Sequence, residues 1–400
     1  MRCTISLWLG LLATAVVPVL AQTAGPAMPT GRIHGHVTNP TGEPQLDGSV
    51  SLSTDGGNTL MFTFPVSATG DYSGVAAPGT YMVVFRAPDT PPGKIVDFVR
   101  NVTVVEGYDV VANVDMSRQE FIDKMPENQK IQVEALRKAN AEAKKANAVI
   151  ESINADLRVV NQDIRDAETA RATAVQSLGA SATAADIATK TAEIQTAKYT
   201  EIETIMTKDT GVRPNESILW TQLARAEVGL KKFDYAESDY KKALVLESAA
   251  EKPMLEGIGE DDAGLGEIYA RHGKVLAANT AFDAAVEAYP KNAASYLRNE
   301  AVIFYQEKNA TAQVAAADEA LKVDPNQAIL YYIKGAGLIE KATIDPKTQR
   351  IVLPKECIDA YQKYLELAPN GPYAAEVTNA LQQAGQKVSS TNNAPGGKSK

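Results

Sequence analysis

The segment 263–290, AGLGEIYARHGKVLAANTAFDAAVEAYP, places small and aromatic residues at the spacing of one tightly packed helical hairpin. Apolar or small positions recur at steps of three and four on both sides of a glycine, which predicts two helices joined by a short turn. The positions that we expect to form the hairpin are Leu265, Gly266, Tyr269, Gly273, Ala278, Phe282, Ala285 and the terminating Pro290. A single hairpin cannot bury its apolar face alone, so the pattern requires stacked neighbours.

The hairpin resembles the tetratricopeptide repeat, whose pattern is W-x2-L-G-x2-Y followed by G, A, F, A and P. The later positions match in register, and Asp262 replaces the leading Trp. Three weaker copies accompany it: SILWTQLARAEVGLKKFDYAESDYKKAL, a segment that ends in EALKVDP, and a segment that begins YYIKGAGL and ends ECIDAYQKYLELAP. The resemblance implies an all-α solenoid over residues 215–386, closed by a capping helix at Tyr373–Gln386.

The copies are spaced more widely than the family period of about 34 residues. The excess falls near Glu247–Gly259 and Ala342–Pro354. The second insertion contains TIDPKTQRIV, which predicts a small protruding β-hairpin. Residues 387–400 are polar and rich in glycine, and are predicted to be a disordered tail.

The first 21 residues have the pattern of a secretory signal peptide. Arg2 gives a positive start, Leu7 to Leu20 an apolar stretch, and Val19-Leu20-Ala21 a small-residue cleavage site. We expect cleavage after Ala21, followed by a linker over residues 22–30. No other apolar run approaches about 18 residues, so no membrane span is expected. The expected location is therefore the periplasm or the cell exterior.

The composition argues against several partner classes. The formal net charge is −9, and removing the signal peptide takes away one arginine and no acid, so it becomes −10. An acidic chain without a basic cluster is not expected to bind nucleic acid or anionic membranes. The exported chain would keep a single cysteine, Cys357, which excludes a disulfide within the chain.

Residues 31–117 alternate β-branched or aromatic residues with polar ones between turn residues, which predicts a small antiparallel β-sandwich. The expected strands are Arg32–Thr38, Gly48–Thr54, Thr59–Pro65, Gly70–Val75, Gly79–Phe85, Ile95–Val105 and Tyr108–Asp115. The segments GHVTNPTGEPQLDGSVSL and GDYSGVAAPGTYMVVF resemble carboxypeptidase-regulatory-like (transthyretin-like) domains. By this resemblance Tyr72 and Tyr81 would fill the core.

Residues 127–208 predict a long helical hairpin or coiled coil. Apolar or small residues recur at alternating steps of three and four, interrupted at Arg171: Leu136, Ala139, Ala143, Ala146, Ile150, Ile153, Leu157, Val160, Ile164, Ala167, Ala174 and Leu178. Gly179 ends the first helix, and Thr183 with Asp186 forms a capping-box pattern for the second. The seam is expected to close within the chain, and pairing between chains, giving a homo-oligomer, is the alternative.

The inventory of reactive residues does not favour an enzyme. The chain has three histidines; His34 and His36 share one face of a predicted strand, and His272 falls in a turn. Cys357 occupies a repeat position that requires a small buried residue. No zinc-peptidase, P-loop, dinucleotide-binding or nucleophile-elbow motif is present. We therefore expect no catalytic residue, cofactor or metal.

The remaining candidate is the concave face of the solenoid, where the resemblance implies that a protein or peptide partner is bound. Carried over by register, the expected partner-binding residues are Thr221, Arg225, Glu267, Arg271, Arg298, Tyr305 and Tyr332. A one-residue ambiguity affects Arg298 and Tyr305. The sequence thus predicts a multidomain α + β chain that acts as an exported scaffold in cell-envelope assembly. Binding of an envelope glycan or another ligand by the β-sandwich is the alternative.

Overall fold

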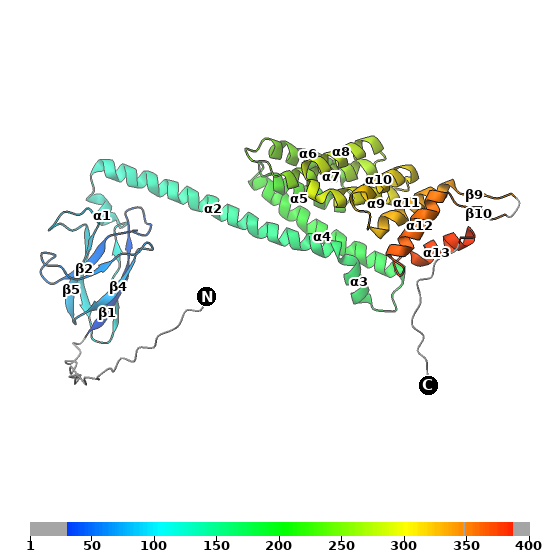
Figure 1. The fold of residues 1–400 in the computed structure, drawn as a ribbon. Helices are drawn as coiled ribbons and strands as arrows, with labels where there is room; N and C mark the ends of the chain where they lie inside the picture. Colours follow the sequence, from blue (N-terminus) through cyan, green and yellow to red (C-terminus); the bar gives the residue numbers. More distant parts are fainter. Residues whose placement is uncertain (1–29, 347–348, 387–400) are drawn as a thin grey trace, which may run out of the picture. The chain divides into compact units, whose positions relative to one another are not determined.

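The computed structural model describes residues 30–346 and 349–386, and shows a β-sheet region followed by helices (Figure 1). The signal peptide (1–21), most of the linker (22–29) and the tail (387–400) lie outside the described residues. Contacts divide the chain into residues 1–149 and 150–400, with the boundary inside one long helix. Each unit is described by itself. None of the described helices combines the length and apolar composition needed to cross a membrane.

The first sheet is centred on β1, Gly31–Thr38, which pairs antiparallel with β4, Asp71–Ala76. On its other side β1 pairs in parallel with β7, Asp109–Val111, and β8, Val114–Asp115. The prediction of a purely antiparallel arrangement was therefore wrong, and the expected strand 108–115 is split in two. The reason is a crossover: the chain returns from the second sheet and runs beside β1 in the same direction.

The second sheet is antiparallel throughout, in the order β3-β2-β5-β6. Its strands are β2, Ser49–Ser53; β3, Met61–Pro65; β5, Gly79–Arg86; and β6, Asp97–Val104. Side chains from both sheets form one buried cluster, which includes Tyr72 of the first sheet and Tyr81 of the second. Both tyrosines therefore occupy the core, as the resemblance implied.

Two side chains of the following helix contact the loops of the β-sheet region. After α1, Gln119–Asp123, the chain enters α2, Glu127–Glu168. Arg137 of α2 donates to the carbonyl oxygens of Pro40 (3.0 Å) and Ser117 (2.7 Å). Lys144, two helical turns further on, pairs with Glu43 at 2.6 Å. The first part of α2 therefore packs on the loops of the β-sheet region.

The long helical segment is divided differently from the prediction. The structure separates α2 from α3, Ala170–Leu178, at Thr169, where the sequence pattern predicted one helix to Leu178. The second helix, α4, is Ala184–Val212. Its capping box is confirmed, because the Thr183 side chain accepts from the backbone N–H of Asp186 and the Asp186 carboxylate accepts in return.

The heptad seam of α2 is buried in its second half and exposed to solvent in its first half. Ile153, Val160 and Ile164 are buried, and Lys198 and Lys208 of α4 pair with Asp163 and Asp156 of α2, each at 2.5 Å. This half of the seam therefore pairs within the chain. By contrast, Leu136 in the first half is 53% exposed, and the three alanines that follow it on the seam are also exposed.

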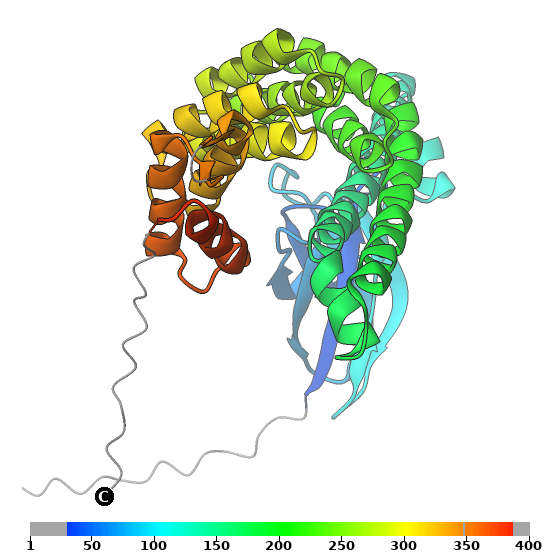
Figure 2. The ribbon, with the colours of Figure 1, turned by 90° about the vertical axis from the view of Figure 1, so that its right-hand side faces the viewer.

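Eight helices form four consecutive hairpins that follow an arc in Figure 2. They are α5 (Ser217–Gly229), α6 (Phe233–Ser248), α7 (Leu255–Arg271), α8 (Val275–Ala288), α9 (Ala293–Gln306), α10 (Ala310–Val323), α11 (Ala328–Leu338) and α12 (Lys355–Leu367). A final helix, α13, is Ala374–Gln383. The predicted small hairpin between α11 and α12 is present as the antiparallel pair β9, Thr343–Ile344, and β10, Ile351–Val352.

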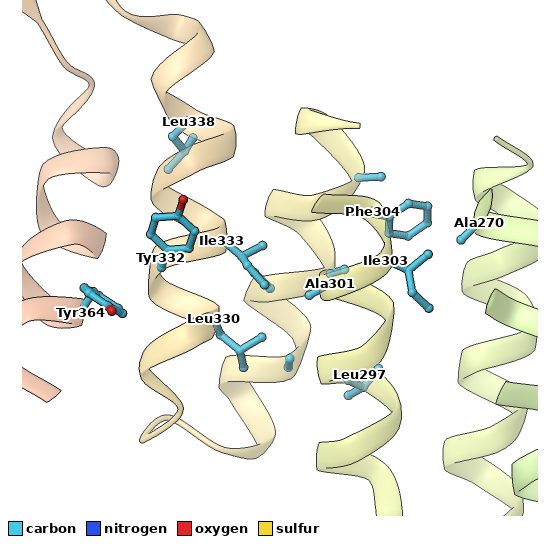
Figure 3. Close-up of a cluster of buried hydrophobic side chains, with 14 of the residues drawn as sticks. Ala270, Leu297, Ala301, Ile303, Phe304, Leu330, Tyr332, Ile333, Leu338 and Tyr364 are labelled. Atoms are coloured by element: carbon cyan, nitrogen blue, oxygen red, sulfur yellow. The ribbon is translucent and has the colours of Figure 1, made fainter. Parts of the chain in front are cut away.

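Small residues let these helices approach one another closely. A Cβ atom at Gly266 would lie 2.8 Å from the ring of Phe282, so only glycine leaves space for that ring. Gly273, in the turn between α7 and α8, has a φ of +71°, a conformation that favours glycine. Figure 3 shows the same packing further along the array, where Phe304 and Leu330 project between neighbouring helices.

Candidate functional site

A hollow of about 490 Å³ lies along the first helices of the array. Its walls come from α4, α5, α7 and α9, with smaller contributions from α6 and α8. We call this hollow the groove. Its size falls within the range typical of ligand sites, and it is partly open to solvent. Among the expected partner-binding residues, the structure brings Thr221, Arg225, Glu267 and Arg271 together in the groove.

One face of α7 forms the centre of the groove. Glu260, Gly264, Glu267 and Arg271 follow one another at steps of three or four residues, which places them on one side of the helix. Gly264 lies against the ring of Tyr240, which a Cβ atom at this position would approach to 2.3 Å. The groove floor is therefore shaped by a glycine, and its charged residues stand on either side of that glycine.

The face of α9 in the groove carries Tyr296, Asn299 and Ile303. Arg298 and Tyr305 lie off this face and are not part of the groove lining. The one-residue ambiguity in the expected register of this repeat explains the difference, because adjacent side chains point about 100° apart around a helix. Asn299, and not the expected Arg298, therefore lines the groove.

The other wall combines α5 with α4, whose part in the groove the sequence did not suggest. Tyr199 of α4 rests on Gly229, where a Cβ atom would come within 2.3 Å of the ring. Arg225 of α5 donates to Glu168 at 2.7 Å. Thr221 borders the groove but is almost fully buried. The wall therefore carries an aromatic ring and a charged group one helical turn apart along α5.

Some charged groups of the groove form ion pairs, and one does not. Arg271 pairs with Glu267 at 2.7 Å and with Glu307 at 3.1 Å. The Glu260 carboxylate has no cation within 4 Å among the residues that the structure describes. Burial raises its pKa, and the field of Arg225 only partly opposes this effect. The groove therefore contains one acid without a counterion.

Tyr332, the expected residue of the fourth repeat, is not accessible. It is 2% exposed, and its ring stacks on that of Tyr373 with centroids 3.8 Å apart. Its hydroxyl donates to Glu376 of α13 at 3.0 Å and lies 3.1 Å from that of Tyr305. The capping helix covers this part of the array, which corrects the expectation that Tyr332 is free to meet a partner.

We expect Tyr373→Ala to loosen α13 without unfolding the array. The substitution removes the stacking on Tyr332 and the support for the Tyr332–Glu376 hydrogen bond, at a cost of about 1–3 kcal/mol. Hydrogen exchange of the α13 amides should accelerate, while that of α7 and α8 stays the same. Unchanged exchange in α13 would show that this stacking does not hold the helix.

The other reactive residues are in structural settings. Cys357 is buried, its thiol donates to the Gly335 carbonyl at 3.3 Å, and burial raises its pKa to about 11, so it is not a reactive thiolate. His272 lies edge-on to Phe233. In the described part of the chain no cluster of three or more acidic, histidine or cysteine side chains is arranged to hold a metal ion.

A second hollow, of about 580 Å³, lies on the outer face of the first sheet. His34 and His36 line it, as their shared strand face predicted, and His36 Nδ1 lies 2.9 Å from Asp71 Oδ1. Asn113 and Tyr72 also border it, but the Tyr72 ring is buried. The lining offers hydrogen-bonding groups and no exposed tyrosine, tryptophan or phenylalanine ring for a sugar to stack on.

The chain is similar to tetratricopeptide repeat proteins of known structure. YrrB, described as a TPR protein with an unusual peptide-binding site, has 14% identity and a TM-score of 0.33, covering 47% of this chain and 89% of its own. MamA has 15% identity and a TM-score of 0.33, covering 43% of this chain and 90% of its own. PilF of Pseudomonas aeruginosa has 14% identity and a TM-score of 0.34, covering 55% of this chain and 89% of its own.

A DUF3823 family protein from Parabacteroides merdae is also similar, with 20% identity and a TM-score of 0.17 over 22% of this chain and 45% of its own. No protein-family model and no curated protein matches the chain. The function proposed below rests on the residues of this chain.

Proposed function

We propose that this chain is a non-enzymatic scaffold that binds an extended peptide segment of another protein in the groove. The observation that carries the proposal is the groove lining, in which charged and aromatic side chains from four helices face one open hollow. Such a mixture suits a peptide, whose backbone requires hydrogen bonds and whose side chains require both apolar contacts and charge partners. The repeats supply the rigid frame that holds these side chains in place.

We place this activity outside the cytoplasm, in assembly of the cell envelope, on the pattern of residues 1–21. The positive start, apolar stretch and small residues before Ala21 support export. The mature chain isolated from the exported fraction should begin at Gln22 when its N-terminus is sequenced. A mature protein that retains Met1 would contradict this part of the proposal.

Glycan binding by the β-sheet region is the alternative that the sequence raised. The polar hollow around His36 and Asp71 provides hydrogen-bonding groups for it. Sugar sites in proteins commonly add an aromatic platform, and the only tyrosine in this lining is buried. We therefore assign the function to the groove.

We expect Asn299→Trp to abolish peptide binding, because the indole would fill the groove from α9. A peptide library displayed on phage is selected on the immobilised full chain, and individual peptides are then measured by fluorescence polarisation. The groove variant should lose at least tenfold in affinity, a change of about 1.4 kcal/mol.

The matched control is Leu276→Trp, which adds the same side chain at a position on α8 that is 82% exposed and outside the groove. It should bind the selected peptides as the unaltered chain does. Equal binding by both variants would move the peptide site elsewhere, and failure to select any peptide would contradict the proposed function.

A further inference from the structure

We propose that the groove selects peptides that carry a lysine or arginine side chain, which pairs with the carboxylate of Glu260. This inference rests on the proposed function and names the chemistry of its partner. Its occupant is a basic segment of another protein in extended conformation. The charges of the groove and the exposed amide of Asn299 support such an occupant.

Glu260 is the acid in the groove that lacks a counterion. It lines the groove together with Asn299 of α9, and no lysine or arginine nitrogen in the described part of the chain forms an ion pair with it within 4 Å. A half-buried carboxylate loses hydration without gaining an ion pair, so it attracts a cation more strongly than an exposed carboxylate does. A basic side chain entering the groove compensates this charge.

The cations of the groove do not offer a comparable site for an acidic partner. Arg225 is already paired with Glu168, and Arg271 is paired with both Glu267 and Glu307. Lys231 is exposed in the turn between α5 and α6, where water solvates its ammonium group. Charge complementarity therefore favours a basic occupant, and the chain's net charge of −9 adds to the attraction.

A neighbouring side chain offers hydrogen bonds in the same groove. Tyr296 lines the groove, but it is 5% exposed and its hydroxyl is buried next to Asn292 and Gly259, out of reach of a peptide. Asn299 borders the groove one helical turn further along α9. Its exposed side-chain amide gives an extended backbone both a donor and an acceptor in the groove that contains Glu260.

The test uses the full chain and synthetic peptides of about nine residues, a length that spans roughly 30 Å when extended. The peptides have mixed flanking residues and a fixed central lysine, arginine, norleucine, glutamine or glutamate. Affinities are measured by fluorescence polarisation for the unaltered chain, Glu260→Gln, Glu260→Lys and Glu267→Gln. The last variant is the matched control, because Glu267 lies on the same face of α7 but is already paired.

We expect lysine- and arginine-centred peptides to bind the unaltered chain about tenfold more tightly than norleucine-centred ones. Glu260→Gln should remove that preference and leave the affinity for norleucine peptides unchanged, whereas Glu267→Gln should retain most of it. Glu260→Lys should reverse the preference towards glutamate-centred peptides. Thermal unfolding of each variant verifies that the fold persists.

The outcomes separate this inference from the proposed function. If peptides bind and Asn299→Trp abolishes the binding, but lysine gives no advantage or Glu260→Gln does not remove it, the basic partner is wrong and the groove is still the peptide site. If none of the peptides binds in the groove, whichever central residue it carries, both proposals are overturned.

Discussion

Replacing Phe282 by alanine should destabilise the array by about 3–5 kcal/mol, the largest single effect that we expect. The Phe282 side chain is 1% exposed and packs against Gly266 of the preceding helix and against the buried alanines of its own hairpin. Its removal leaves a cavity that a stacked pair of helices cannot collapse to fill. Urea unfolding followed by far-ultraviolet circular dichroism measures the change in the free energy of unfolding.

The control for this prediction is Leu276→Ala on the same helix. Leu276 is exposed, so its truncation should change stability by no more than about 0.5 kcal/mol. Phe282→Leu, which keeps most of the volume, should fall between the two. A loss below about 1 kcal/mol for Phe282→Ala would mean that α7 and α8 do not depend on this contact.

The array should become less stable as the pH rises from 5 to 8, because several of its carboxyl groups are buried. Burial, with the neighbouring carboxylates of Asp239 and Glu203, raises the pKa of Glu227 from 4.5 to about 8. Burial raises the pKa of Asp261 from 3.8 to about 8 and that of Glu300 from 4.5 to about 7. The folded chain therefore keeps protons that the unfolded chain releases above its ordinary pKa, so stability falls as pH rises through this window.

Glu227→Gln should weaken this pH dependence. Glutamine keeps the shape of the protonated acid, so the variant should match the unaltered chain at pH 5. At pH 8 it should be more stable by roughly 4 kcal/mol, since about three of the pKa units between the folded and unfolded states take effect at that pH and each unit corresponds to about 1.4 kcal/mol. Urea unfolding at pH 5, 6, 7 and 8 provides the comparison.

The control is Glu237→Gln, since the ion pair with Lys241 lowers the pKa of Glu237. This variant should retain the decline in stability with rising pH. If Glu227→Gln shows the same decline as the unaltered chain, Glu227 is not protonated in the folded state at neutral pH.

Local spacing predicted most elements of the chain, although not the break at Thr169 or the division of the expected strand 108–115. Leu265, Ala278, Phe282 and Ala285 are buried, as the 263–290 pattern required. The capping box at Thr183 and the small hairpin in the fourth repeat are also present. These features depend on residues only a few positions apart, and their geometry follows from the helix and turn themselves.

The candidate site was predictable only in part. Positions transferred by register placed Arg225, Glu267 and Arg271 correctly in the groove. Glu260 is not among the expected residues: it directly follows the expected insertion 247–259, whereas α7 begins at Leu255 and extends the groove face by one turn. The signal was available in the continued spacing of Glu260, Gly264 and Glu267 along one helix face.

The role of α4 in the groove required the tertiary structure. Tyr199 lies in the helix that precedes the repeats, and nothing in its local spacing showed which helix it would face. The same limitation applies to the heptad seam, whose regular pattern did not reveal that α4 pairs with its second half, as the Lys198–Asp163 bond shows. A heptad specifies an apolar face, and many helices can complement one such face.

The sequence by itself determined where most helices and strands form and that the repeats must stack, because periodic small and apolar residues set those features locally. Only the tertiary structure decided which polar side chains share the groove, that Tyr332 is covered by Tyr373, and that Glu260 lacks a counterion. The physical reason is that burial and pairing of charges depend on contacts between residues far apart in the chain. One residue of register or one added helical turn changes those contacts without changing the apolar pattern.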